Sequence, residues 1–186
     1  MLGYSINNSM EPNTRNFVTI IGGQHGDEPT GARICHGLYP MRSTELIIIP
    51  CINPLGFKAK TRECQGIDLN RSYDGEIESL VVAKSITLIK TLCQLSRLVI
   101  DVHSTHAFML DQPVFLVNDF ADGYRQCFDI AEFQSEAPVG SLRWYCNKIS
   151  TPMITYEAVE FDPIDDKQIQ TGIDEILKVL GHAGIN

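Results

Sequence analysis

Basic residues are scarce in this sequence: 15 Lys and Arg stand against 23 Asp and Glu, which gives a formal net charge of -8. Binding to DNA or RNA depends mainly on Lys and Arg side chains that neutralise phosphates. The charge balance therefore argues against a nucleic acid partner. It remains compatible with a small anionic substrate, provided that a few arginines converge on one site.

Long apolar runs and paired cysteines are also missing. No apolar run is long enough to span a bilayer, and Met1 to Ser5 show neither the charged nor the apolar region of a signal peptide. We therefore expect a cytoplasmic protein with no membrane partner. The six cysteines never form a C-x-x-C pair, so a cysteine zinc site or a thioredoxin-type motif is unsupported. In a reducing compartment we expect most of them to be small buried groups, above all Cys35 and Cys51.

The apolar segments predict alternating strands and helices in one domain over residues 1–186, of which 44% are hydrophobic. Continuous apolar runs predict buried strands at residues 17–21, 45–50, 98–102, 113–117 and 153–156. Helices are predicted at residues 29–39, 76–95, 121–133, 141–148 and 165–181. In the second helix the predicted apolar stripe is Ile77, Val81, Leu88, Leu92 and Leu95, and a polar loop is expected over residues 57–75. The alternation predicts an α/β fold with helices on both faces of the sheet.

Polar residues follow the ends of these predicted strands. His25 and Glu28 follow the first strand, a loop containing Arg62 and Arg71 follows the second, and His103 follows the third. Glu157 follows the strand at residues 153–156. In open sheets of this class the ligand crevice lies outside the carboxyl ends of the strands, so these side chains can meet in one site.

His25, Glu28 and His103 make a candidate metal-ligand set. Two imidazoles and one carboxylate suit zinc and leave a fourth position open for water, as a catalytic zinc requires. For the stretch around His25 the alternative is an ordinary strand-to-helix turn with a polar tip. For His103 the alternative is a hydrogen-bonded core histidine. The occurrence of all three residues at strand ends favours the metal site.

Glu157 is the candidate for proton transfer. A water activated by a metal needs a base that takes its proton and later passes it to the leaving amine. Glu157 has no basic residue near it in the sequence, so it is free to take this role. The alternative is a solvated charge near a strand end.

Six short motifs follow one another between about residues 17 and 157. They are HGDE at 25–28, NPLG at 53–56, Arg62, DLNR at 68–71, DVH at 101–103 and TPMITYE at 151–157. In this order they resemble the zinc carboxypeptidase superfamily, and within it the succinylglutamate desuccinylase/aspartoacylase branch or the similar small murein-peptide amidases. The resemblance implies one zinc hydrolase domain with a mixed, mostly parallel central sheet and helices on both faces.

The resemblance also implies a role for each motif residue. His25, Glu28 and His103 would bind one zinc ion per chain, with Glu157 as general base and acid. Arg62 would steady the oxyanion of the tetrahedral intermediate. Asn70 and Arg71 would hold a substrate carboxylate, although Arg71 by itself could instead form a local ion pair with Asp68. Asp101 would orient His103 or a neighbouring backbone group.

These roles together predict a zinc-dependent hydrolase that cleaves an amide bond in a small substrate bearing a carboxylate. The favoured class is an N-acyl amino acid deacylase. The alternatives are a metallocarboxypeptidase, a murein-peptide amidase that takes a short peptide, and an inactive carboxylate-binding module. Members of the branch usually carry a C-terminal β-rich domain, whereas here a helix and a short tail follow Glu157, so we expect a cleft more open to a peptide.

Two further features stay open at the level of sequence. The carboxypeptidases use a mobile tyrosine near the substrate, for which Tyr124 and Tyr145 are candidates. A second metal bound through Asp27, His106 or Glu160 is also compatible with the sequence.

Overall fold

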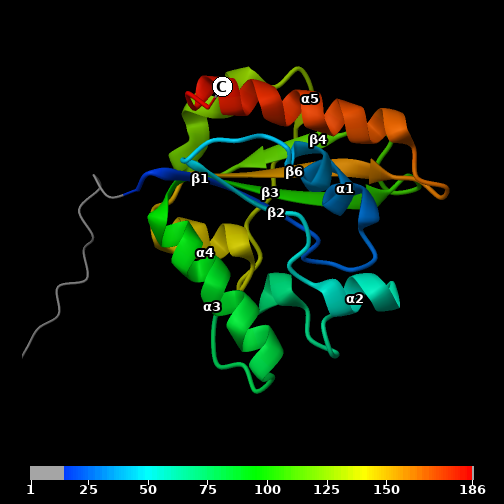
Figure 1. The fold of residues 1–186 in the computed structure, drawn as a ribbon, viewed down its shortest axis with the longest axis vertical. Helices are drawn as coiled ribbons and strands as arrows, with labels where there is room; N and C mark the ends of the chain where they lie inside the picture. Colours follow the sequence, from blue (N-terminus) through cyan, green and yellow to red (C-terminus); the bar gives the residue numbers. More distant parts are fainter. Residues whose placement is uncertain (1–14, 186) are drawn as a thin grey trace, which may run out of the picture.

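A computed structural model describes residues 15–185 (Figure 1). Met1 to Ser5, where the sequence predicts no targeting segment, lie outside these residues. Between residues 15 and 185 the strands form a six-stranded sheet in the order β2-β1-β3-β6-β4-β5. The strands are β1 (Phe17–Gly22), β2 (Leu46–Ile49), β3 (Ser96–His106), β4 (Val114–Val117), β5 (Ala131–Glu132) and β6 (Met153–Glu160).

The sheet is mixed and mostly parallel, as predicted. β2, β1, β3 and β6 run parallel to one another, β4 runs antiparallel to β6, and β5 runs parallel to β4. The carboxyl ends of the four parallel strands therefore meet at one edge of the sheet. This edge carries the motif residues identified in the sequence.

Helices cover both faces of the sheet, which confirms the predicted fold class (Figure 1). α1 (Pro29–Leu38) and α5 (Asp166–His182) pack over one face. α3 (Leu80–Leu95) and α4 (Leu142–Lys148) pack over the other. Each face has its own apolar core, because successive side chains of a strand point to opposite sides of the sheet.

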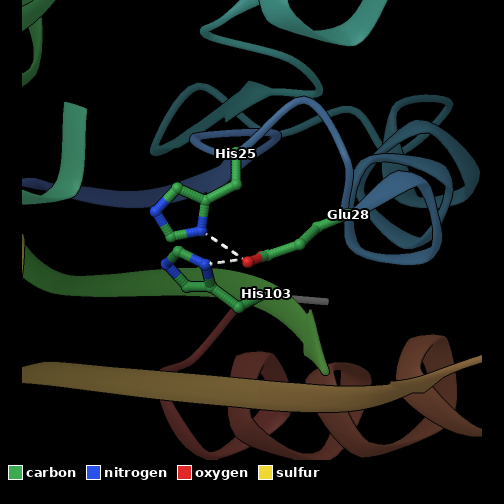
Figure 2. A group of neighbouring side chains, drawn as sticks. All are labelled: His25, Glu28 and His103. Carbon is green, nitrogen blue, oxygen red and sulfur yellow. Dashed lines mark hydrogen bonds and ion pairs between the residues drawn. The ribbon is translucent and has the colours of Figure 1, made fainter. Parts of the chain in front are cut away.

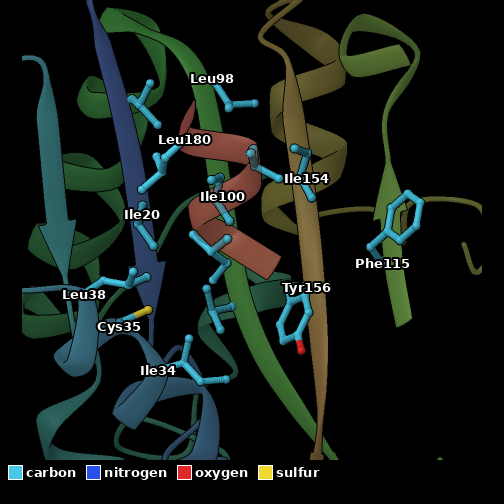
Figure 3. Close-up of a cluster of buried hydrophobic side chains, with 14 of the residues drawn as sticks. Ile20, Ile34, Cys35, Leu38, Leu98, Ile100, Phe115, Ile154, Tyr156 and Leu180 are labelled. Atoms are coloured by element: carbon cyan, nitrogen blue, oxygen red, sulfur yellow. The ribbon is translucent and has the colours of Figure 1, made fainter. Parts of the chain in front are cut away.

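The strands show this alternation directly. Ile20 and Ile154 lie in the core beneath α1 and α5, which Figure 3 shows. Their neighbours Ile21 and Met153 lie in the core beneath α3 and α4. All four side chains are fully buried, as expected for strands in the centre of a sheet that is covered on both faces.

Capping residues set where three helices begin. The side-chain oxygens of Ser79, Ser141 and Asp165 accept hydrogen bonds from backbone N–H groups in the first turns of α3, α4 and α5. α4 and α5 begin within one residue of their predicted starts, because the predicted first residues, Ser141 and Asp165, are the caps. α3 begins at Leu80 rather than at residue 76, because Ser79 caps it.

The buried stripe of α3 differs from the prediction. The helix buries Val82, Ile86, Ile89 and Cys93, whereas Val81 and Leu88 of the predicted stripe are 44% and 48% exposed. α3 carries apolar residues on more than one side, so helical periodicity alone does not decide which of two neighbouring apolar stripes is buried. Packing against the sheet selects between them.

The segment predicted as a helix at residues 121–133 has a different structure. It forms a 3-10 helix at Asp119–Cys127, followed by the short edge strand β5. The N–H of Phe133 donates to the backbone oxygen of Phe115 at 2.8 Å. Pairing with β4 at the edge of the sheet therefore outweighs the weak helical pattern of this segment.

The predicted loop at residues 57–75 contains more regular structure than expected. α2 (Pro54–Ala59) runs into it, capped by the side chain of Asn53, and a 3-10 turn covers Leu69–Arg71. β3 and β6 are also longer than predicted. His103 and Glu157 therefore lie inside strands rather than after them, which fixes their backbones by sheet hydrogen bonds.

The cysteines and the helices add two observations. All six cysteines are free thiols, and Cys35 is buried as predicted while Cys51 is half-buried. Among residues 15–185, no helix combines the length and the apolar character that crossing a membrane requires.

Candidate metal centre

The turn that carries His25 and Glu28 has a backbone that depends on glycine. Gly23 has a φ of 61°, in the left-handed region that glycine adopts without strain. A Cβ atom on Gly26 would lie 1.9 Å from the backbone carbon of Gly56, so no larger residue fits there. The N–H of Gly26 donates to the backbone oxygen of Thr61 at 3.0 Å. These contacts hold the turn against the segment that follows β2.

The turn and β3 bring the three predicted ligands together (Figure 2). Glu28 lies between two imidazoles: its Oε1 is 2.5 Å from Nδ1 of His25, and its Oε2 is 2.8 Å from Nδ1 of His103. Each residue offers a donor atom within 4.8 Å of the other two. Both histidines are almost fully buried, with 3% of their surface exposed. Two imidazole nitrogens and a carboxylate oxygen that converge in this way fit the donor set of a zinc site.

A carboxylate also contacts Nε2 of each histidine, the ring nitrogen that does not face Glu28. Nε2 of His25 lies 3.2 Å from Oδ1 of Asp68, and Nε2 of His103 lies 2.9 Å from Oδ2 of Asp101. A carboxylate can only accept, so each imidazole donates from Nε2 and directs Nδ1 toward the common centre. The orienting role that the sequence suggested for Asp101 thus has a matching contact, because residues 101 and 103 point to the same side of β3.

These carboxylates change the pKa values of the cluster. Burial alone would lower the pKa of His103, but Asp101 and Glu28 raise it well above its ordinary value. The pKa of His25 is also raised, since Asp68 and Glu28 outweigh burial. Burial would raise the pKa of Glu28, yet the two imidazoles lower it strongly. The carboxylates therefore favour protonation of the two imidazoles, and the imidazoles in turn favour ionisation of Glu28.

Binding of a metal ion by these three residues should consequently weaken as the pH falls. Metal and proton compete for Nδ1, and raised pKa values keep the protons bound to a higher pH, so affinity should drop by about tenfold per pH unit for each proton displaced. Chelator competition between about pH 6 and pH 9, around and above the ordinary histidine pKa of about 6.5, measures this. An affinity that stays constant over that range would contradict the assignment of both histidines as ligands.

Glu157 lies beside the cluster on β6. It is the register partner of His103 across the parallel pair of β3 and β6, so both side chains project from the same face of the sheet. The hydroxyl of Thr105 donates to Oε2 of Glu157 at 3.1 Å. Burial raises the pKa of Glu157, and the Glu28 carboxylate adds to this, while His103 and Thr105 act in the opposite direction.

Arg62 and His25 share one carboxylate. Nε of Arg62 donates to Oδ2 of Asp68 at 2.9 Å, while the other oxygen of Asp68 contacts His25. One terminal nitrogen of Arg62 lies 3.6 Å from Glu28. The Arg62 side chain is 43% exposed, and its guanidinium borders the cluster.

Asn70 and Arg71 follow on the 3-10 turn. Nδ2 of Asn70 lies 3.4 Å from Nε2 of His103, and its Oδ1 accepts from the backbone N–H of Leu142 at 2.8 Å. Arg71 is exposed and donates to the backbone oxygen of Asn70 at 2.6 Å. Within the part of the chain that the structure describes, Asp68 pairs with His25 and Arg62 rather than with Arg71. The local ion pair considered from the sequence is thus not formed.

A cleft of about 420 Å³ contains all of these groups. Its lining includes the seven residues that the sequence singled out: His25, Glu28, Arg62, Asn70, Arg71, His103 and Glu157. Apolar side chains from β4 and beyond β5 continue the cleft past Glu157, among them Val114, Leu116 and Phe133.

Arg143 also lines the cleft and was missed in the sequence. It is half-buried on α4 and donates to the backbone oxygens of Ser135 and Glu136 and to the hydroxyl of Ser135. Burial lowers its pKa, while the charge of Glu157 raises it. Its sequence neighbours form no motif, so only the packing of α4 over the sheet reveals its position.

The structure bears on the two features that the sequence left open, the tyrosine near the substrate and a second metal. Tyr145 packs from α4 into the core that this helix shares with α3, and neither Tyr124 nor Tyr145 is among the residues that line the cleft. Glu160 is buried and accepts hydrogen bonds from Thr30 and Ser104. Between residues 15 and 185, His25, Glu28 and His103 form the only group of three or more His, Cys, Asp and Glu residues whose donor atoms converge closely enough to hold an ion. A second metal near Asp27, His106 and Glu160 is thus unsupported.

Solved structures share this fold. The product-bound ectoine utilization protein EutE (DoeB) from Ruegeria pomeroyi superposes with a TM-score of 0.76 at 23% identity, over 91% of this chain and 58% of that chain. A succinylglutamate desuccinylase/aspartoacylase from Rhodobacter sphaeroides superposes with a TM-score of 0.71 at 20% identity, over 92% and 57%. Csd4, a D,L-carboxypeptidase from Helicobacter pylori in its mDAP-bound form, gives 0.72 at 15% identity, over 95% and 54%.

The chain thus spans little more than half the length of these proteins, and likenesses at such identities establish the fold. No curated protein matches the sequence. A family model does match: that of the succinylglutamate desuccinylase/aspartoacylase catalytic domain, over residues 15–183. Since this match runs through nearly the whole chain and includes every residue of the cluster, the protein belongs to the succinylglutamate desuccinylase/aspartoacylase catalytic-domain family.

Proposed function

We propose that this protein is a zinc-dependent hydrolase that cleaves an amide bond in a small carboxylate-bearing substrate, as an N-acyl amino acid deacylase. One observation carries the proposal: Glu157 stands in register with His103, beside the convergent donor atoms of His25, Glu28 and His103. An acid-base group next to a site for a divalent cation is the arrangement that hydrolysis by activated water requires. The family supports a hydrolase of this kind.

His25, Glu28 and His103 would hold the zinc ion through two nitrogens and a carboxylate. Such an ion, when bound, supplies a Lewis acid that acidifies water and polarises a carbonyl. Glu157 would accept the proton of the attacking water and deliver it to the leaving amine. Its raised pKa, caused mainly by burial, suits a group that must both take and return a proton.

Arginines would recognise the charged parts of the substrate. Arg62 would stabilise the oxyanion that forms on the carbonyl oxygen, because its guanidinium borders the cluster. Arg71, together with Nδ2 of Asn70, would bind the substrate carboxylate. A planar guanidinium suits a carboxylate because it can donate two parallel hydrogen bonds.

Arg143 supports a substrate with a second carboxylate. Its three hydrogen bonds leave two of the five N–H donors of an arginine free. Among residues 15–185 it has no carboxylate ion-pair partner, although it faces the cleft. An N-acylated dicarboxylic amino acid would place its acidic groups on Arg71 and Arg143.

The alternative is a carboxypeptidase or murein-peptide amidase. It is favoured by the apolar side of the cleft, where Val114, Leu116 and Phe133 would contact a longer substrate. Hydrolysis of N-acetylaspartate, N-succinylglutamate, N-acetylalanine, a C-terminal dipeptide and a murein tripeptide compares these classes. The proposal predicts turnover of the first two substrates above the others. Preference for either peptide would favour the alternative, and zinc binding without any turnover would favour a carboxylate-binding module.

Arg71→Ala should raise KM for carboxylate substrates by about 10- to 100-fold, since a hydrogen bond to a charged group contributes about 1.5 to 3 kcal/mol. The variant should lose its discrimination between a free acid and the corresponding amide. Arg42→Ala, which removes a charge outside the residues that line the cleft, serves as the control. Unchanged discrimination in the Arg71 variant would contradict the anchoring role.

A further inference from the structure

Four buried side chains form a continuous row of hydrogen bonds that ends on His103. The hydroxyl of Tyr73 lies 2.9 Å from Oε1 of Gln24, Nε2 of Gln24 lies 2.8 Å from Oδ2 of Asp101, and the same oxygen lies 2.9 Å from Nε2 of His103. None of the four side chains is more than 3% exposed. We call Tyr73, Gln24, Asp101 and His103 the buried relay.

The relay has one direction of donation. Oε1 of Gln24 can only accept, so the hydroxyl of Tyr73 donates to it. Burial raises the pKa of Tyr73 well above its ordinary value, which keeps this proton in place. The carboxylate of Asp101 only accepts, so the amide must present its NH₂ group to it, and this excludes the flipped orientation of the Gln24 side chain. The hydroxyl of Tyr73 then supplies the proton that the buried Oε1 accepts.

Asp101 depends on Gln24 for its own orientation. Its Oδ1 atom is buried and has no hydrogen-bond partner among residues 15–185. Its Oδ2 atom accepts from Gln24 and from His103. Gln24 is therefore the contact that holds the carboxylate independently of the histidine. Without it, the carboxylate would be free to turn away from Nε2 of His103.

The state of His103 follows from this arrangement. Because Oδ2 of Asp101 only accepts, Nε2 of His103 donates to it and keeps its proton. Nδ1 is therefore the nitrogen left to bind a metal ion, on the side where it contacts Glu28 and where the ligand atoms converge (Figure 2). Gln24 also directly precedes His25, so adjacent residues of the turn provide one ligand and orient the other.

Tyr73 is well placed to anchor the relay. Its N–H donates to the backbone oxygen of Gly140 at 2.8 Å, and its ring stacks on that of Tyr145 with centroids 6.2 Å apart. It therefore ties the donor cluster to the segment just before α4, on the opposite face of the sheet from α1.

We infer that Gln24 and Tyr73 are positioning residues that fix Asp101 against His103 and thereby set the affinity of the metal site. The inference rests on the proposed zinc site. It adds Gln24 and Tyr73, which are not metal ligands themselves, to the residues that build the site. The loss of a group that orients a metal ligand typically weakens metal affinity by about 10- to 100-fold.

The test compares zinc affinity in Gln24→Met, Tyr73→Phe and a control. Gln24→Met removes both polar groups with little change of shape, and Tyr73→Phe removes only the hydroxyl. Tyr145→Phe is the matched control, since it removes a hydroxyl from a buried tyrosine that bonds to Gln94 rather than to the relay. Chelator competition gives the affinity, the visible spectrum of the cobalt-substituted protein reports ligand geometry, and thermal unfolding of the metal-free protein reports stability.

Gln24→Met and Tyr73→Phe should each weaken zinc binding by about tenfold or more and alter the cobalt spectrum, while Tyr145→Phe leaves both unchanged. If the two relay variants match the control in affinity and spectrum, the inference is wrong, whatever their thermal stability. Should Gln24→Met fail to fold, Tyr73→Phe alone decides. A wild-type protein that binds no zinc would instead overturn the proposed metal site, and this inference with it.

Discussion

Glu157→Gln should reduce kcat/KM by about 10²- to 10⁴-fold while zinc remains bound. That range is the usual contribution of a general acid-base group, and an amide of the same shape cannot accept and return a proton. Zinc should remain because Glu157 is not one of the three convergent ligands. The measurement is turnover of the best substrate together with the zinc content of the same preparation.

Glu136→Gln is a suitable control for this experiment, because Glu136 is exposed and does not line the cleft. It should keep both activity and zinc. Loss of zinc together with activity in Glu157→Gln would show that Glu157 is a ligand. Full activity in that variant would exclude it as the base.

His25→Ala should remove both zinc and activity. The site would keep only Glu28 and His103, so zinc affinity should fall by more than the roughly 10- to 100-fold that loss of an orienting partner costs. His25 suits this test better than His103, because its partners Glu28 and Asp68 are 14% and 18% exposed and water can reach them, whereas Asp101 is buried. Leaving a buried charge without its partner would destabilise the fold itself.

The exposed His106 supplies the control for this variant. It lies at the end of the same strand as His103 but outside the donor cluster. His106→Ala should bind zinc as the wild type does. Stoichiometric zinc in His25→Ala at the same affinity would mean that the ion is held elsewhere.

Much of the fold follows from local sequence. The strand cores are continuous apolar runs, and a sheet covered on both faces requires that pattern in each central strand. The start of α1 at Pro29 and the caps of α4 and α5 are also local signals. These features were predicted because the residues that cause them lie within a few positions of one another.

Where the prediction failed, the deciding contacts are distant in sequence. Nothing within α3 distinguishes the stripe of Val82 and Ile86 from that of Val81 and Leu88, since the sheet makes the choice. β5 exists because residues 131–132 pair with β4, and its own sequence resembles the end of a helix. Both errors arise where tertiary packing outweighs a local periodicity.

The candidate site likewise contains residues that the local sequence reveals and residues that only the fold reveals. His25 and Glu28 are recognisable because their spacing sits on a turn that needs glycine, and His103 and Glu157 because they belong to motifs. Arg143 and Gln24 carry no such signal. Their importance comes from the position of α4 over the cleft and from the approach of Tyr73 to the turn, and Tyr73 and Gln24 are 49 positions apart in the sequence.

The most direct test of this account is the metal content of the purified wild-type protein, measured after reconstitution with zinc and removal of excess metal. The account predicts about one zinc ion per chain, lost in His25→Ala and retained in Glu157→Gln. Absence of bound zinc in the wild type, even after reconstitution, would contradict the assignment of His25, Glu28 and His103 as ligands and the hydrolase that we build on it.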